Sequence, residues 1–285
     1  MSAPYSRRSI LRQLTVLAAV GSASPAFARE RKQKLLVERV EILVPGLPPA
    51  MDGFRIAQLS DLHLEPFTTE EDILHSVELC NSLLPDMVAL TGDFVTHTAR
   101  PAPKVAELLS QLKAPYGVYA SLGNHDFASG APEVIRALTE RNIPVLRNEI
   151  RRIRTDNGTL VLGGFDSMYV NRPDVRKTLQ DWKQHQPLVL MMHEPDAADT
   201  IAAAGVKALQ ISGHTHGGQL VFRGKTPMSL RRAKFGKKYL AGRYEVGGLQ
   251  MYVNRGIGCV GVPLRIGCPP EVTELTLRSP ELLRA

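Results

Sequence analysis

Cysteine and aromatic residues are scarce in this 285-residue chain, which has three cysteines, one tryptophan and an aromatic fraction of 6%. No two cysteines form a CxxC pair, which argues against a structural zinc site built from thiolates. Cys80 falls within an apolar helical pattern, so we expect it to pack as a small hydrophobic residue. Cys259 and Cys268 could form a disulfide if the chain is exported, and the sequence leaves that pairing open.

Long hydrophobic runs, internal repeats and low-complexity tracts are also missing. The apolar run from Leu14 to Val20 is far shorter than the roughly 20 residues that span a bilayer. No helix-turn-helix, zinc-finger or RNA-binding signature is present, and the formal net charge of +7 is modest. Nucleic acid is therefore not an expected partner. The hydrophobic fraction of 44% is enough for a substantial globular core.

Residues 1–28 have the layout of an export signal. Three arginines and no acidic residue precede or flank the short apolar run, and Ala26-Phe27-Ala28 closes it with a small-x-small pattern. The order Ser6-Arg7-Arg8-x-Ile10-Leu11 resembles the twin-arginine signal. We therefore predict a signal peptide over 1–28, the twin-arginine export machinery as a partner, and a periplasmic or other extracytoplasmic location. The alternative is an uncleaved N-terminus that holds the protein at a membrane.

Hydrophobic periodicity predicts strands and helices that alternate at first, with strands more frequent later. Strands are expected at 35–44, 54–59, 87–90, 116–122, 149–154, 159–162, 188–192, 206–211, 249–254 and 271–277. Helices are expected at 70–84, 105–112, 132–141, 174–182 and 197–204. Because no linker follows residue 34, we expect one domain over residues 29–285, of the α/β class, with packed β-sheets covered by α-helices.

Potential metal ligands follow five of the predicted strands, at the point where each strand ends. They are Asp61 and His63, then Asp93, then Asn124 and His125, then His193, and finally His214 and His216. Since ligands of open α/β sheets gather at the carboxyl ends of strands, these segments should converge. Imidazole and carboxylate ligands suit zinc, iron or manganese. Two such ions about 3.5–4 Å apart can stabilise both the attacking and the leaving oxygen at a phosphorus atom.

The stretch SGHTHGGQ places His214 and His216 on either side of Thr215, among glycines. In an extended turn, alternate residues point the same way, so each imidazole could reach a different ion of a close pair. The glycines would let the backbone approach the ions closely. We interpret this stretch as a metal-binding loop.

The motifs DLH, TGDF, GNHD, the isolated His193 and GHTH, in that order, resemble the calcineurin-like metallophosphoesterases from about Phe54 to the end of the chain. The longer GHTHGGQ and the closing NRGIG…PLRIGCPPEVTEL are similar to a bacterial branch. That branch includes twin-arginine-exported phosphodiesterases and enzymes that act on UDP-2,3-diacylglucosamine. The resemblance implies a four-layer sandwich in which two central mixed β-sheets are flanked by α-helices.

The resemblance also implies a dinuclear centre of two divalent or trivalent ions, of manganese, iron or zinc, and a role for each residue. One ion would be held by Asp61, His63 and His216, the other by Asn124, His193 and His214, and Asp93 would bridge them. A hydroxide between the ions would attack phosphorus. His125 would face the phosphate and stabilise or protonate the leaving oxygen, and Asp126 would hold that imidazole in position.

The implied activity is metal-dependent hydrolysis of phosphoester bonds, with a phosphodiester as the first choice of substrate. The first alternative is cleavage of a lipid-linked pyrophosphate such as UDP-2,3-diacylglucosamine. The second is a metal-loaded binding module without catalysis. The partner is then a phosphoester, either a small molecule or linked to a lipid.

A few further residues allow two interpretations. Asp196 is expected to cap the following helix, Glu194 to support the site or simply to be polar, and His97 to be a solvated loop residue. Many relatives carry an acid where this chain has Thr96. The basic run from Leu230 to Tyr239 is either a mobile loop or a rim that attracts phosphate or an anionic membrane surface.

Overall fold

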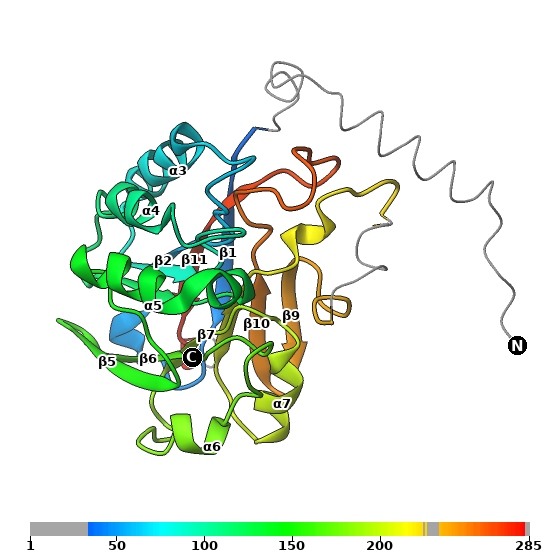
Figure 1. Cartoon of the computed structure of the whole chain (residues 1–285). Helices are drawn as coiled ribbons and strands as arrows, with labels where there is room; N and C mark the ends of the chain where they lie inside the picture. Colours follow the sequence, from blue (N-terminus) through cyan, green and yellow to red (C-terminus); the bar gives the residue numbers. More distant parts are fainter. Residues whose placement is uncertain (1–33, 225, 227–233, 283–285) are drawn as a thin grey trace, which may run out of the picture.

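The computed structural model describes residues 34–224, 226 and 234–282 (Figure 1). The predicted signal peptide and the first part of the basic run lie outside these residues. Within the described ranges, no helix combines the length and the apolarity needed to cross a membrane.

Two mixed β-sheets form the centre of the molecule. The first has the order β1-β11-β2-β3-β4, with bounds Leu36–Leu43, Glu271–Arg278, Arg55–Leu59, Met87–Thr91 and Val118–Ser121. The second has the order β5-β6-β7-β8-β10-β9, with bounds Glu149–Thr155, Gly158–Gly164, Leu188–Met191, Leu209–Ser212, Leu249–Val253 and Gly242–Val246. Strands β2, β3 and β4 are parallel to one another, and so are β6, β7, β8 and β10. Their carboxyl ends are where the site is built.

Helices cover the outer face of each sheet (Figure 1). The first sheet is covered by α3 (Glu70–Ser82), α4 (Ala102–Leu109) and α5 (Asn124–Glu140), and the second by α6 (Val175–Thr178) and α7 (Ala197–Ala203). Two short 3-10 helices, η1 (Pro49–Met51) and η2 (His216–Gly218), lie in loops. The predicted four-layer α/β sandwich, with two central mixed sheets flanked by helices, is confirmed.

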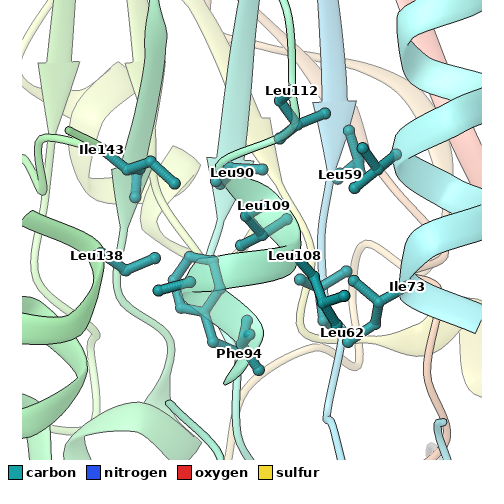
Figure 2. Close-up of a cluster of buried hydrophobic side chains, with 14 of the residues drawn as sticks. Leu59, Leu62, Ile73, Leu90, Phe94, Leu108, Leu109, Leu112, Leu138 and Ile143 are labelled. Atoms are coloured by element: carbon teal, nitrogen blue, oxygen red, sulfur yellow. The ribbon is translucent and has the colours of Figure 1, made fainter. Parts of the chain in front are cut away.

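The alternation of side chains along the strands explains the layers. In β2, Ala57 and Leu59 pack toward the helices, whereas Ile56 packs between the sheets. Figure 2 shows the helix-facing cluster, in which Leu59 and Leu90 from the strands meet Ile73 and Leu109 from the helices. A third cluster packs the second sheet against α6 and α7. Strands buried on both faces therefore read as continuous apolar runs.

Element boundaries differ from the predictions where loops carry local capping. Helix α4 begins at Ala102, three residues before the predicted start, because prolines are tolerated in a first turn. Helix α5 begins at Asn124 instead of residue 132, with a kink at Gly130 (φ 133°) before the predicted part. Helix α6 ends at Thr178, four residues early, and strand β9 (Gly242–Val246) was not predicted.

The cysteines are not cross-linked in the described residues. Cys80 is fully buried, as predicted. Cys268 donates a hydrogen bond from its thiol to the carbonyl oxygen of His216 (3.0 Å), and no disulfide joins it to Cys259. Cys268 therefore packs against the loop that carries His214 and His216.

Candidate metal centre

The carboxyl ends of β2, β3, β4, β7 and β8 bring the predicted residues together. Asp61 and His63 follow β2, Asp93 follows β3, and His193 follows β7. Asn124 and His125 open α5 after β4, and His214 and His216 follow β8. Both sheets thus contribute side chains to one site. Six of these residues fall into two groups whose potential ligand atoms lie within 4.8 Å of one another: Asp61, His63 and His216, and Asp93, His193 and His214. A third group of the same kind, His63, Asp93 and His125, overlaps both.

The first group is compact and buried. His63 Nε2 lies 3.2 Å from His216 Nε2, and His216 Nε2 lies 3.4 Å from Asp61 Oδ1. Asp61 and His63 are fully buried. Two imidazole nitrogens this close to each other and to a carboxylate have the spacing of ligands that share one cation.

Asp93 belongs to the second group and also lies next to His63 of the first. Its Oδ2 atom lies 3.4 Å from His63 Nε2 and 3.1 Å from His193 Nε2. Its other oxygen, Oδ1, accepts a hydrogen bond from the backbone N–H of His125 (2.8 Å). One carboxylate oxygen is therefore in reach of a histidine from each group.

Five of the seven predicted ligands adopt a left-handed backbone. Their φ angles are 52° for Asp61, 48° for His63, 56° for Asp93, 72° for His214 and 50° for His216. Residues other than glycine rarely adopt this conformation, and it concentrates at functional sites because the surrounding fold holds it in place. The prediction of an extended turn at residues 214–216 is therefore wrong, since His216 opens the 3-10 turn η2. The two histidines nevertheless join different groups.

Close backbone approach requires glycine at two positions around the carboxylates. A Cβ atom at Gly123 would collide with Asp93 Oδ1, and one at Gly213 would collide with Ser60 Oγ and Asp61 Oδ2. The glycines of GNHD and GHTH are thus needed for space as well as for turns.

The second nitrogen of the key histidines is anchored by the backbone. His193 Nδ1 donates to the Thr91 carbonyl oxygen (2.6 Å), since a carbonyl can only accept. His216 Nδ1 lies 3.3 Å from the Gly258 carbonyl oxygen. Such contacts fix the ring orientation and leave Nε2 as the atom directed into the centre.

The charges of the centre favour a bound cation. Burial opposes ionisation of Asp93, but the neighbouring His193 and His63 outweigh it and hold its pKa well below the ordinary value. Burial likewise opposes protonation of His193, yet Asp93 and Asp61 raise its pKa well above the usual range. Burial and the nearby His63 and Arg265 keep the pKa of His216 low. A metal ion would take over the positive charge that His193 otherwise supplies.

Unpaired polar atoms support the same conclusion. Among the described residues, Asn124 Oδ1 and His214 Nε2 at this centre are buried without a hydrogen-bond partner. Buried polar atoms are normally satisfied, and coordination of a metal ion would satisfy these. The residues present therefore fit a metal centre, and carboxylate, imidazole and amide donors without thiolate suit zinc, iron or manganese.

The His125 imidazole is held by Thr96 and not by Asp126, which corrects the role expected of Asp126. His125 Nδ1 donates to the Thr96 carbonyl oxygen (2.8 Å), and its ring centroid lies 4.9 Å from that of His63. Asp126 does not hold this imidazole. Its carboxylate accepts backbone N–H bonds from Gly123, Asp93, Phe94 and Val95 (2.8–3.3 Å). Burial and the charge of Asp93 raise the pKa of Asp126 to about 7, although the backbone donors of Gly123 and Val95 oppose this shift.

Two residues that support the site were not predicted. Thr96 is buried, and its hydroxyl donates to the Glu65 carbonyl oxygen (2.7 Å) and lies 3.4 Å from His63 Nδ1, so it contacts both His63 and His125. The Arg265 guanidinium is buried beneath His216, 3.2 Å from its Nδ1, and donates to the Gly258 carbonyl oxygen (2.6 Å). Contacts to backbone carbonyl groups leave no pattern in a sequence. The only signal for Arg265 was that it lies in the PLRIG stretch, which is similar to the bacterial branch.

The structure also distinguishes between the two interpretations given for Glu194, Asp196 and His97. Glu194 is fully buried and accepts hydrogen bonds from Ser167 Oγ (2.5 Å) and Met168 N (3.0 Å), so it supports a loop beside the site. Asp196 precedes α7 without capping it, and accepts instead from the Gly236 N–H (2.6 Å). His97 is exposed, as expected, and its ring centroid lies 6.5 Å from that of His125.

Comparisons with known proteins agree with this geometry. Residues 54–218 match the calcineurin-like phosphoesterase family. The chain is 35% identical to the uncharacterised metallophosphoesterase YkuE of Bacillus subtilis, over 82% of each chain. It is 31% identical to a transmembrane protein with metallophosphoesterase domain of Bos taurus, over 93% of this chain and 61% of that protein.

Among solved structures, TT1561 of Thermus thermophilus is similar, with a TM-score of 0.48 and 13% identity over 71% of this chain and 89% of that one. The assignment of the chain to a family therefore rests on the sequence matches and not on this structural likeness. The family match covers more than half of the chain and includes all five ligand-bearing segments. The chain therefore belongs to the calcineurin-like phosphoesterase family.

Proposed function

We propose that this protein is a phosphodiesterase with a dinuclear metal centre. Family membership and the two groups of ligand-type residues support metal-dependent hydrolysis of phosphoesters. The observation that carries the dinuclear proposal is the position of Asp93 Oδ2, 3.4 Å from His63 Nε2 and 3.1 Å from His193 Nε2. An oxygen shared by both groups is what a bridging carboxylate requires.

In this proposal Asp61, His63 and His216 would hold one ion, Asn124, His193 and His214 would hold the second, and Asp93 would contribute to both. When bound, the ions would neutralise charge on the phosphoryl oxygens and lower the pKa of a water molecule. The backbone contacts of His193 and His216 keep the ligand nitrogens in place without movement during the reaction.

His125 is the residue placed to assist the leaving group. Its Nδ1–H is occupied by the Thr96 carbonyl, so in the imidazolium form Nε2–H is the group that can donate a proton to the departing oxygen, which leaves the neutral imidazole. In the overall reaction a water oxygen forms the new P–O bond, the P–O bond to the alcohol breaks, and the alcohol leaves with a proton. Asp126 has a structural role, because its carboxylate fixes the loop of Asp93 and the first turn of α5.

We also propose that the protein acts outside the cytoplasm. The support is the order of residues 1–28, with paired arginines, a short apolar run and a small-x-small end. The substrate would then be a phosphoester of that compartment, either a small molecule or linked to a lipid.

The test is turnover of bis(p-nitrophenyl) phosphate by protein stripped of metal and reloaded with manganese, iron or zinc. We expect chelator-sensitive release of p-nitrophenolate and slower turnover of p-nitrophenyl phosphate, the corresponding monoester. Absence of turnover with every metal would refute the proposal. Release of UMP from UDP-2,3-diacylglucosamine, faster than diester cleavage, would favour the pyrophosphatase alternative.

A further inference from the structure

An aromatic pair, Tyr169 and Phe235, lies beside the His214 side of the centre and has no role in the reaction described so far. The ring centroid of Tyr169 lies 5.7 Å from that of His214, with an interplanar angle of 57°. It also lies 5.2 Å from the Phe235 centroid, with the rings at 88°. Tyr169 is 42% exposed, which makes it one of the few large apolar side chains on the described surface.

The backbone and the hydroxyl of Tyr169 are both held by hydrogen bonds. The buried Glu194, next to His193, accepts hydrogen bonds from Ser167 Oγ and Met168 N. The Tyr169 N–H donates to the same Ser167 hydroxyl (3.2 Å), and the Lys234 N–H donates to the Tyr169 hydroxyl oxygen (3.1 Å). A ring fixed at both ends loses little freedom when a ligand packs against it.

Phe235 is fixed to the loop that carries His214. The Gly236 N–H donates to Asp196 Oδ2, and a Cβ atom at Gly236 would lie 3.1 Å from His214 Cδ2, so this segment lies against the imidazole. The Lys234 ammonium lies 5.1 Å from the Phe235 centroid and covers one face of that ring. Tyr169 therefore offers the accessible aromatic surface, with Phe235 behind it and a positive charge nearby.

The pair and His125 adjoin different parts of the centre. His125 packs against His63, whereas Tyr169 packs against His214, which in turn packs against His193 (5.2 Å between centroids). A phosphodiester has two substituents. If one leaves beside His125, the other is directed elsewhere, and a phosphate at the centre would bring it within reach of Tyr169.

We propose that Tyr169 binds the substituent that stays on the phosphate, and that this substituent is planar and aromatic. The inference rests on the proposed function and narrows it to diesters with an aryl or nucleoside group on the retained side. Stacking on an aromatic side chain contributes enough to change binding by about tenfold or more per ring.

The experiment uses three diesters with the same p-nitrophenolate leaving group and different retained groups. These are bis(p-nitrophenyl) phosphate, the p-nitrophenyl ester of thymidine 5′-phosphate and ethyl p-nitrophenyl phosphate. For each substrate, kcat/KM of the metal-loaded variant is divided by that of the wild type, which removes differences in intrinsic reactivity. We expect Tyr169→Leu to lower this ratio at least tenfold more for an aromatic retained group than for ethyl. Tyr169→Phe should keep most of the preference because the ring remains.

Leu84→Ala is the matched control. Leu84 is 72% exposed and precedes β3, at the amino ends of the strands and away from the centre. Metal content and thermal unfolding of each variant check that the centre is intact. A larger effect on the thymidine ester indicates a nucleoside, and a larger effect on the nitrophenyl ester indicates another aryl group; either supports the inference. Equal losses on all three substrates, or none, would overturn it. Lack of chelator-sensitive turnover by the wild type would instead remove the proposed function.

Discussion

At the level of single residues, the imidazole of His125 is the group that distinguishes catalysis from metal binding alone. It is half-buried, its Nδ1 is bonded to the Thr96 carbonyl, and it lies close enough to His63 and Asp93 to be a potential ligand, but the proposed centre assigns it to neither ion. Its removal should therefore affect the departure of the leaving group and leave the ions in place.

We predict that His125→Ala lowers kcat roughly 10²- to 10⁴-fold for a diester with an alkyl leaving group. The loss should be much smaller for p-nitrophenyl esters, because p-nitrophenolate departs without a proton. Steady-state kinetics on both substrate types, with metal analysis of each preparation, measure this difference. His97→Ala, an exposed neighbour whose ring centroid lies 6.5 Å from that of His125, is the control and should change kcat little. Equal losses for both leaving groups, or loss of a metal ion, would show that His125 has a different role.

The residues that form the centre could be predicted because their chemistry and position are both visible in the sequence. Asp93, His193 and their partners are ligand types that directly follow apolar strands, and parallel strands end at the same edge. The contacts of the residues that support them could not be predicted. Thr96 acts partly through its carbonyl oxygen, and Asp126 binds backbone N–H groups, which every residue except proline carries. Arg265 is likewise held by carbonyl groups.

At the level of elements, strand positions followed from apolar runs, whereas helix starts depended on local contacts that the sequence does not reveal. GNHD was interpreted as a loop that ends β4, but Asp126 caps the first turn of α5 by accepting the Gly123 N–H (2.9 Å). The predicted start at Pro132 was wrong because proline is typical of the first turn of a helix. Here Pro132 lies inside α5, just after the kink at Gly130. Strand β9 was missed because its five residues have little apolar character, with half-buried and exposed positions alternating along an edge.

The segment from Lys234 to Leu240 is fastened to α7 by Asp199. Asp199 Oδ1 accepts hydrogen bonds from Lys238 Nζ (2.7 Å) and Tyr239 Oη (2.8 Å). Burial raises the pKa of Asp199, but these hydrogen bonds outweigh it and lower the pKa below the ordinary value. A carboxyl group whose folded-state pKa is lowered stabilises the fold above its unfolded pKa of about 3.9, and loses this effect as the pH falls through the folded value.

We therefore predict that Asp199→Asn lowers the free energy of unfolding at pH 7 by less than about 1 kcal/mol, since the pair is exposed to solvent. The difference in the free energy of unfolding between variant and wild type should narrow as the pH falls from about 5 toward 3. Urea unfolding at several pH values measures it, with Glu107→Gln as the control for a surface pair, because Glu107 pairs with Lys104 at 2.9 Å on α4. A gap that does not change with pH would mean that the charge of Asp199 is not what fastens the segment.

At the level of the whole molecule, the centre joins the two sheets. Asp61, His63 and Asp93 come from the first sheet, and His193, His214 and His216 from the second. The ligands are distant in the sequence, so an ion that binds all of them binds only the folded state. Such binding stabilises the fold by about 2.7 kcal/mol when the free ion is at 100 times its Kd.

For a domain of this size we expect the unfolding temperature of metal-stripped protein to rise roughly 5–10 °C as manganese is added to that level. Differential scanning calorimetry measures the rise, and metal analysis should find two ions per chain.

Asp93→Asn provides the sharper comparison. Burial and the neighbouring Asp93 raise the pKa of Asp61, which reflects the repulsion between two buried carboxylates. Replacing Asp93 by a neutral amide relieves that repulsion but also removes the charge that pairs with His193 and His63, so the stripped variant should unfold at a temperature equal to or below that of the stripped wild type. It should gain little from manganese, because the shared oxygen no longer carries a charge. The difference in unfolding temperature between the two proteins should thus widen when metal is added. An equal rise in both would show that Asp93 does not bridge the ions.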